Sequence, residues 1–192
     1  GASWSAPTVI IDPPGPTRAY DPALWHDPTG RLWLFYNQAD QLNRDFAVWA
    51  MTTDESHLAK PQWSLPRKIE LNAAFSFRLN KPTVLTTGQW LLPVTWAVNA
   101  PTDWFPGESQ LQGVAISVNS GLTWTLHGSV EAPGWALENM IVECHDGRLW
   151  MLIRAGGGVI WQSFSTDCGT TWSLGSPTPL VNPGVRFFVR RL

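Results

Sequence analysis

The sequence contains one eight-residue motif twice, 48 residues apart. The second copy, residues 165–172, reads S-T-D-C-G-T-T-W, and the first, residues 117–124, reads S-V-N-S-G-L-T-W. In each copy the Asp or Asn side chain can accept hydrogen bonds from nearby backbone N–H groups, the Gly can adopt positive φ, and the Trp can pack under the turn. Such an octet predicts a tight turn between two antiparallel strands. Two copies in one register predict a repeat architecture.

Two weaker signals repeat in phase with the octet. Degenerate copies of it end at Trp4 and Trp63, so the four motif tryptophans are spaced by 59, 61 and 48 residues. A turn Gly followed by an apolar run occurs between them at 30–34, 88–92 and 147–151. Each repeat therefore reads as strand, tight turn, strand, longer loop, strand, octet turn and strand. No stretch shows helical periodicity, and 16 Gly with 16 Pro fit many turns, so we expect an all-β chain.

Four antiparallel strands per unit at this period predict a β-propeller, with a β-sandwich as the alternative all-β fold. A sandwich would not need the same turn at the same phase of each unit. The expected organisation is one partial β-propeller domain, 1–192, with blades at about 20–75, 76–133 and 134–183 and partial strands at 1–12 and 185–192. Three blades cannot close a ring without leaving open edges. The sequence therefore indicates either part of a longer propeller or a homodimer that completes one ring.

Composition and charge exclude several function classes. A net charge of −2 argues against a nucleic-acid partner, and no apolar run reaches the length of a membrane span. The two Cys and four scattered His show no metal-ligand spacing, so we expect neither a metal nor a cofactor. The spacing of Cys144 and Cys168 allows a disulfide without implying one.

Thirteen tryptophans are the unusual feature of the composition. Seven belong to the repeated motifs and are expected in the core between blades: Trp4, Trp33, Trp63, Trp90, Trp124, Trp150 and Trp172. Core packing is also the simplest role for the others, among them Trp96, Trp135 and Trp161. Because aromatic rings stack on sugar faces, one or two of these others are candidates for lining a carbohydrate pocket.

Ionisable residues occur at corresponding positions of successive repeats. The first strand of a propeller blade runs along the central axis, and residues at its entry end line the mouth. These positions hold Asp21, Lys81, Glu138 and Arg186. Charged side chains in otherwise apolar strands cost desolvation energy unless they pair or function. Two interpretations remain open, namely a functional pocket and a set of satisfied ion pairs around a water-filled channel.

The segment 136–154 resembles part of the sialidase (neuraminidase) superfamily. In that family a Glu opens a strand, a D-G-x-L turn follows, and the return strand ends in Arg; here these are Glu138, residues 146–149 and Arg154. The octets resemble the Asp boxes of the same family, so the resemblance covers essentially the whole chain. It implies a six-bladed propeller, a glycan substrate and a secreted or extracytoplasmic location.

The sialidase catalytic set comprises three Arg that clamp the carboxylate of sialic acid, an Asp general acid, and a Tyr nucleophile activated by a Glu, in place of the usual carboxylate pair. By resemblance, Glu138 matches the activating Glu and Arg154 matches the second clamp Arg. The family's R-I-P-A-L segment corresponds to Tyr-Asp-Pro-Ala-Leu at 20–24, so a Tyr replaces the first clamp Arg. The general acid matches Asp45, 25 residues after Tyr20, with Asp40 as the competing candidate.

Two members of the sialidase set have no counterpart in this sequence, namely the third clamp Arg and the Tyr nucleophile. The only tyrosines are Tyr20 and Tyr36, both in the first repeat. The resemblance implies a catalytic pair, Glu138 and Asp45, and a substrate-binding Arg154. The entry positions of the repeats add Asp21, Lys81 and Arg186 to the predicted substrate-binding set.

Two hypotheses follow from these assignments. The leading one is a sialidase-like glycoside hydrolase that acts on a terminal sugar, acidic or neutral, and is seen here as an incomplete catalytic propeller. The alternative is a non-catalytic carbohydrate-binding or scaffold propeller. We expect the 192-residue chain alone to be inactive unless two copies share a site.

The repeat phasing makes a geometric prediction. Four ionisable residues should converge at one end of the inner strands, namely Asp21, Lys81, Glu138 and Arg154, with the octet turns at Asn119 and Asp167 on the outer rim. Arg154 ends the strand that runs back toward the start of the first strand. It should therefore reach Glu138, although 16 residues separate them in the sequence.

Overall fold

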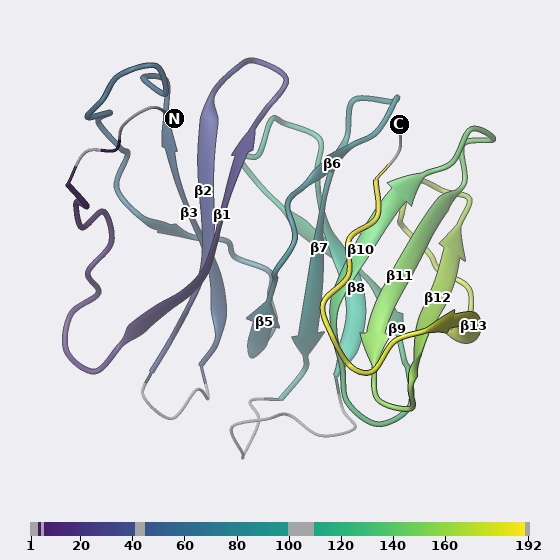
Figure 1. Cartoon of the computed structure of the whole chain (residues 1–192). Coiled ribbons are helices and arrows are strands. Elements are labelled where there is room, and N and C mark those ends of the chain that lie inside the picture. Colours follow the sequence, from purple (N-terminus) through teal and green to yellow (C-terminus); the bar gives the residue numbers. More distant parts are fainter. Residues whose placement is uncertain (1–3, 5, 41–44, 100–109, 191–192) are drawn as a thin grey trace.

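The computed structural model describes residues 4, 6–40, 45–99 and 110–190. These residues form thirteen β-strands and no helix, so the expectation of an all-β chain is confirmed. The strands lie in three antiparallel sheets that stand side by side along an arc (Figure 1). With no helix in the described part of the chain, no segment of it has the helical length and apolar character that a membrane crossing requires.

Each sheet is built from consecutive strands of the chain. The first sheet contains β1 (Arg18–His26), β2 (Leu32–Ala39), β3 (Ala47–Thr53) and β4 (Arg67–Lys68). The second contains β5 (Phe75–Phe77), β6 (Thr83–Val84), β7 (Trp90–Ala97), β8 (Leu111–Ser117) and β9 (Thr125–Val130). The third contains β10 (Ala136–Glu143), β11 (Leu149–Ala155), β12 (Val159–Ser165) and β13 (Ser176–Val181). The inner, concave side of the arc carries β1, β6 and β10 (Figure 1).

The inner strand of the second sheet is interrupted, which the repeat pattern did not predict. Both β5 and β6 pair with β7, and residues 78–82 between them leave the ladder. Pro82 has no N–H to donate to a neighbouring strand. The Arg78 backbone instead exchanges two hydrogen bonds with the Asn37 side chain of the first sheet, at 3.0 and 2.7 Å. The interruption therefore ties the second sheet to the first.

The inner strands of the first and third sheets each carry a β-bulge near their start. The pairing register shifts between Tyr20 and Ala23 in β1 and between Leu137 and Met140 in β10. An ionisable residue with positive φ sits inside each bulge, Asp21 at 50° and Glu138 at 61°. Such a conformation costs a non-glycine residue about 1–3 kcal/mol and is concentrated at functional sites. A bulge also re-aims the side chain that it carries.

Two core clusters lie between neighbouring sheets, and a third, smaller one belongs to the first sheet. Since β7 has a sheet on either side, it is buried on both faces, with Trp90 and Leu92 packed toward the first sheet and Leu91 toward the third. Trp33 belongs to the first cluster, and its ring meets that of Trp90 edge to face with centroids 5.9 Å apart. Met151 of β11 belongs to the second cluster and is fully buried. These apolar strands hold the three sheets in the arc.

The predictions for the two ends of the chain are wrong. Trp4 is 90% exposed, so it is not a core residue. The described residues of 1–12 and 185–192 contain no strand, contrary to the expected partial strands. A strand needs a neighbouring edge for its backbone hydrogen bonds, and none of the described strands pairs with these segments.

Both octets form the expected turns. In the second octet the carboxylate of Asp167 accepts hydrogen bonds from the Thr171 N–H at 2.9 Å, the Thr171 hydroxyl at 2.6 Å and the Ser165 hydroxyl at 2.8 Å. Ser165 pairs with Leu149 at the start of β11, whereas Glu138 lies at the far end of that hairpin. The octet turn is therefore at the opposite end of the sheet from Glu138, as the phasing predicts.

We expect the Asp167→Ala variant to lose about 1 kcal/mol of unfolding free energy at pH 7, since it removes these partly exposed hydrogen bonds. The Thr171 hydrogen bonds hold the pKa of Asp167 below its usual value of 3.8. Because the folded-state pKa is depressed, this stabilisation is complete above the usual pKa and is lost as pH falls through the lowered value. Urea unfolding at pH 7 and in acid measures the difference between variant and wild type. A difference that does not shrink in acid would contradict this prediction.

Candidate functional site

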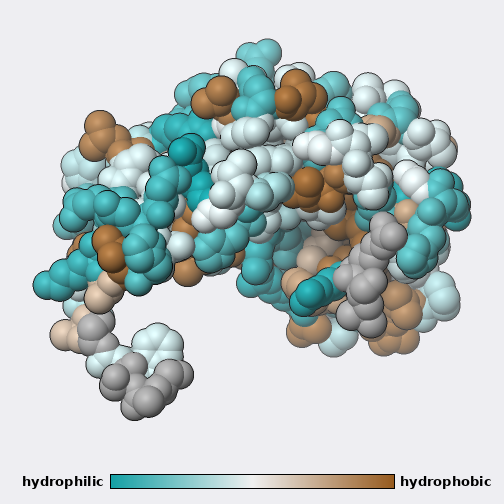
Figure 2. Space-filling model, turned by 90° about the horizontal axis from the view of Figure 1, so that it is seen from above, coloured by the Kyte–Doolittle hydropathy of each residue, from teal (hydrophilic) through white to brown (hydrophobic). Residues whose placement is uncertain are grey.

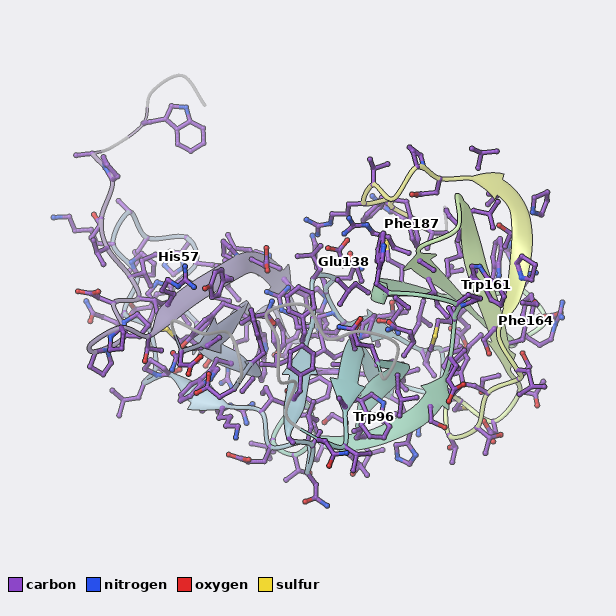
Figure 3. The ribbon with its side chains drawn as sticks, turned by 90° about the horizontal axis from the view of Figure 1, so that it is seen from below. His57, Trp96, Glu138, Trp161, Phe164 and Phe187 are labelled. Atoms are coloured by element: carbon purple, nitrogen blue, oxygen red, sulfur yellow. The ribbon has the colours of Figure 1, made fainter. Side chains whose placement is uncertain are left out.

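The predicted site residues lie at one end of the inner strands. Asp21 and Glu138 stand near the starts of β1 and β10, and Lys81 stands two residues before β6. Arg154 lies near the end of β11, directly opposite Leu137 in the antiparallel register. Figure 3 shows Glu138 on the concave side of the arc.

Glu138 and Arg154 form an ion pair, which confirms the predicted contact between them. Arg154 Nη1 lies 2.7 Å from Glu138 Oε1, and the two side chains are only 23% and 11% exposed. Arg154 Nε donates a second hydrogen bond to the Gly184 carbonyl at 2.7 Å. The guanidinium also lies over the Trp135 ring, with its central carbon 4.9 Å from the centroid. These three contacts fix the orientation of Arg154.

The second oxygen of the Glu138 carboxylate is in a different situation. Glu138 Oε2 is buried and accepts no hydrogen bond from the described residues. Leaving such an acceptor unpaired costs about 1–3 kcal/mol, so native proteins rarely do it without a functional reason. An ionised carboxylate whose free oxygen lies in a shielded place can accept the proton of a hydroxyl group.

Asp21 belongs to a second polar cluster, around the buried side chain of Arg78. Asn37 Nδ2 donates to Asp21 Oδ2 at 3.2 Å. The Arg78 guanidinium is 1% exposed and donates to three carbonyls, those of Asp21, Phe35 and Leu79. Burial lowers the pKa of Arg78 to about 10, although the Asp21 charge opposes the shift. Arg78 therefore remains a cation at neutral pH.

Arg78 and Asn80 were not among the residues singled out from the sequence. Asn80 Nδ2 donates to the carbonyls of Asn139 at 2.8 Å and Glu138 at 3.3 Å, so it contacts the bulge of the third sheet. Arg78 contacts the Asp21 bulge of the first sheet. The segment 78–80 thus connects both bulges. Arg78 could have been found from the sequence, because it is the single charge in the apolar run F-S-F-R-L at 75–79. A cation in such a run must be paired or solvated.

Lys81 and Arg186 line a large hollow. The hollow has a volume of about 1180 Å³ and lies between the inner strands and the segment that follows β13. Asp21, Glu138 and Arg154 do not line it. Figure 2 shows the concave side of the molecule, whose wall carries both hydrophobic and hydrophilic side chains.

Asp45, the predicted general acid, is next to its competitor Asp40. The carboxylate of Asp45 accepts a hydrogen bond from the Asp40 N–H and closes the base of the loop between β2 and β3. Residues 41–44 of this predicted loop lie outside the described residues. Asp45 lines a separate hollow of about 210 Å³ with Phe46. Asp45 lies just before β3, at the end of the first sheet where β1 begins, and among the described contacts none joins Asp45 to Glu138.

The two tyrosines do not meet Glu138 in any described contact. Tyr36 is 1% exposed and packs in a small cluster with Leu34 and Met51 of the first sheet. Tyr20 packs against Phe46, with ring centroids 5.4 Å apart. Both tyrosines therefore pack within the first sheet.

Metal binding and disulfide formation have little support from the geometry. Within the described ranges, no group of three His, Cys, Asp or Glu side chains is arranged to hold a metal ion. Cys144 and Cys168 are both free thiols, so the allowed disulfide does not form.

Sialidases share this fold. The chain matches Trypanosoma rangeli sialidase, solved in complex with sialic acid, with a TM-score of 0.61 at 16% identity over 82% of this chain and 28% of that one. It matches the intramolecular trans-sialidase from Ruminococcus gnavus with a TM-score of 0.60 at 14% identity, over 88% of this chain and 56% of the other. A NanB sialidase variant from Streptococcus pneumoniae matches with a TM-score of 0.58 at 12% identity, over 84% of this chain and 39% of the other.

These similarities show that the chain has an all-β fold like that of sialidases, made of four- to five-stranded antiparallel sheets. The family model of the BNR repeat-like domain matches residues 1–186, and the chain belongs to this family. No curated protein matches the sequence significantly. The chain spans about a quarter to just over half of the length of the sialidases cited above.

Proposed function

We propose that this chain forms part of the catalytic propeller of a sialidase-like glycoside hydrolase, with its three sheets as blades. The observation that carries the proposal is the Glu138–Arg154 pair, in which one carboxylate oxygen is neutralised and the other is buried without a donor. The fold shared with sialidases supports the assignment of the sheets as blades. A homodimer that closes the ring remains a prediction of the sequence.

In this proposal Glu138 polarises the nucleophile by accepting its hydroxyl proton through Oε2. The Arg154 ion pair occupies Oε1 and leaves Oε2 as the oxygen that is available to accept. Arg154 uses Nε and Nη1 in internal contacts and has further N–H groups for an oxygen of the substrate. Asp45 would act as the general acid, and Asp21 would contribute to substrate binding. The proposal assigns no residue as the nucleophile, because no described contact joins a tyrosine to Glu138.

The test is hydrolysis of a panel of fluorogenic glycosides, acidic and neutral. It is run on the chain and on any longer natural polypeptide that contains it. We expect cleavage of at least one glycoside, and a loss of about 10²–10⁴-fold in kcat for Glu138→Gln. The matched control is Glu70→Gln, because the Glu70 side chain is 78% exposed and its only described ion pair, with Lys68, is long at 3.7 Å.

Two results would count against the hydrolase. The first is that no glycoside is cleaved by either polypeptide. The second is that Glu138→Gln retains as much activity as Glu70→Gln. Sugar binding without turnover, unaffected by Glu138→Gln, would instead support the carbohydrate-binding propeller.

A further inference from the structure

The bulge that carries Glu138 takes part of the β10 backbone out of the sheet. The pairing of β10 with β11 runs from Leu137 to Met140 without a partner for residues 138 and 139. Backbone carbonyls that leave a ladder need other donors where they are buried. The positive φ of Glu138 is also unfavourable for a non-glycine residue, and such a conformation persists only where its surroundings hold it. Contacts from outside the third sheet must therefore hold the bulge.

One side chain from the segment between β5 and β6 spans the bulge. Asn80 Nδ2 donates to the Asn139 carbonyl at 2.8 Å and to the Glu138 carbonyl at 3.3 Å. An amide group carries two N–H donors, so a single Asn can serve both acceptors. Asn80 is 5% exposed, so water has little access to replace these hydrogen bonds.

The second sheet holds the backbone of the bulge at two further points. Gln112 Nε2 of β8 donates to the Ala136 carbonyl at 2.8 Å. Asn139 Nδ2 donates in the other direction, to the Gly113 carbonyl at 2.8 Å. The Gln112 and Asn139 side chains are 0% and 2% exposed. Both contacts fix residues beside Glu138, whereas Asn80 bonds to Glu138 itself.

We propose that Asn80 is a positioning residue that aims the Glu138 carboxylate. The inference rests on the proposed glycoside hydrolase, in which Glu138 Oε2 accepts a proton. A bulge re-aims the side chain that it carries, so the direction of Glu138 depends on its backbone conformation. By holding the Glu138 carbonyl, Asn80 maintains that conformation and keeps Oε1 at 2.7 Å from Arg154, with Oε2 left over. Without Asn80, the bulge can relax and the carboxylate turns away from Arg154.

The first test measures the coupling between Glu138 and Arg154 and needs no enzyme activity. Glu138→Gln, Arg154→Met and the double variant are compared by urea unfolding of the chain, with Asn80 present and in the Asn80→Leu background. Leu keeps the number and branching of the Asn heavy atoms but has no donor. We expect the coupling to fall by about half or more in the Asn80→Leu background. An unchanged coupling would overturn the proposal.

A second variant guards against a failure to fold. Asn80→Ala removes the same donor without placing methyl groups against the two carbonyls. It should lower the coupling as Asn80→Leu does, by about half or more. A purely structural role for Asn80 would lower the stability of both variants and leave the coupling as it is in the wild type.

The matched control is Thr178→Val. The Thr178 hydroxyl donates to the Ile160 carbonyl at 2.8 Å and the side chain is 6% exposed, so this variant also removes a buried hydrogen bond to a carbonyl. Thr178 lies in β13, at the opposite edge of the third sheet from β10. The coupling should therefore stay at its wild-type value. Equal falls in Thr178→Val and Asn80→Leu would overturn the positioning role, because any loss of stability would then weaken the pair.

The hydrolysis assay provides the second test. Asn80→Leu should lower kcat about tenfold or more, because a misplaced catalytic group slows the reaction, and should change KM less than about threefold. Thr178→Val should leave both constants within about twofold. A change of KM alone in Asn80→Leu would contradict a role that acts through Glu138.

The two proposals fail in different ways. A coupling that falls in Asn80→Leu, in a protein that cleaves no glycoside, would remove the hydrolase and leave Asn80 as the residue that places Glu138 on Arg154. Cleavage that requires Glu138 but is unchanged by Asn80→Leu would remove the positioning role and leave the hydrolase.

Discussion

Replacement of Arg78 by Met is expected to lower the free energy of unfolding by about 3–5 kcal/mol, the range for breaking a buried charged network. The side chain is 1% exposed, so solvent cannot replace its hydrogen bonds. Without the guanidinium, the carbonyls of Asp21, Phe35 and Leu79 lose this donor. Urea unfolding followed by tryptophan fluorescence measures the loss.

The matched control for Arg78→Met is Arg31→Met. Arg31 pairs with Asp54 at the surface, where their side chains are 45% and 70% exposed, and such pairs contribute little. Arg78→Lys should recover only part of the stability, since an ammonium group cannot replace the planar guanidinium that reaches several carbonyls. Equal losses for Arg78→Met and Arg31→Met would show that Arg78 does not hold the first two sheets together.

The Arg154→Met variant should lose about 2–4 kcal/mol, somewhat less than a fully buried pair, because Arg154 is 23% exposed. The loss arises because the Glu138 carboxylate, 11% exposed, stays in place without its partner. Glu138→Gln removes that uncompensated charge with little change of shape. The double variant Arg154→Met/Glu138→Gln should therefore be more stable than Arg154→Met alone.

A double-mutant cycle on these variants measures the coupling between Glu138 and Arg154. We expect a coupling energy of about 1–3 kcal/mol, as found for contacting residues in one network. The same cycle on Arg31 and Asp54 provides an exposed reference pair, for which we expect a much smaller coupling. Strict additivity of the Glu138 and Arg154 changes would mean that the ion pair does not stabilise the fold.

The sequence determined those features that depend on neighbouring strands. The octets predicted their turns because all the groups that close the turn, such as Ser165, Asp167 and Thr171, lie within eight residues. The contact between Glu138 and Arg154 was predictable for a related reason. They belong to two strands joined by a tight turn, so antiparallel pairing alone brings them to the same end of the hairpin.

Features that depend on how one sheet lies against another could not be predicted from the sequence. Arg78 reaches the Asp21 carbonyl across 57 residues, Asn80 reaches the Glu138 carbonyl across 58, and Arg186 reaches the Leu79 carbonyl across 107. The repeat pattern contains no information on these contacts, because it fixes which residues face outward and not which sheet they meet. The interruption of the second inner strand at 78–82 belongs here as well.

For the large hollow, too, one part could be predicted from the sequence and another depended on the packing of the sheets. That Lys81 and Arg186 occupy corresponding positions of their repeats was visible in the sequence. That they line one hollow, which Glu138 and Arg154 do not line, was decided by the arc of the sheets. Side-chain periodicity is a local property with a period of two residues, whereas the positions of the sheets follow from the packing of whole faces such as those of β7.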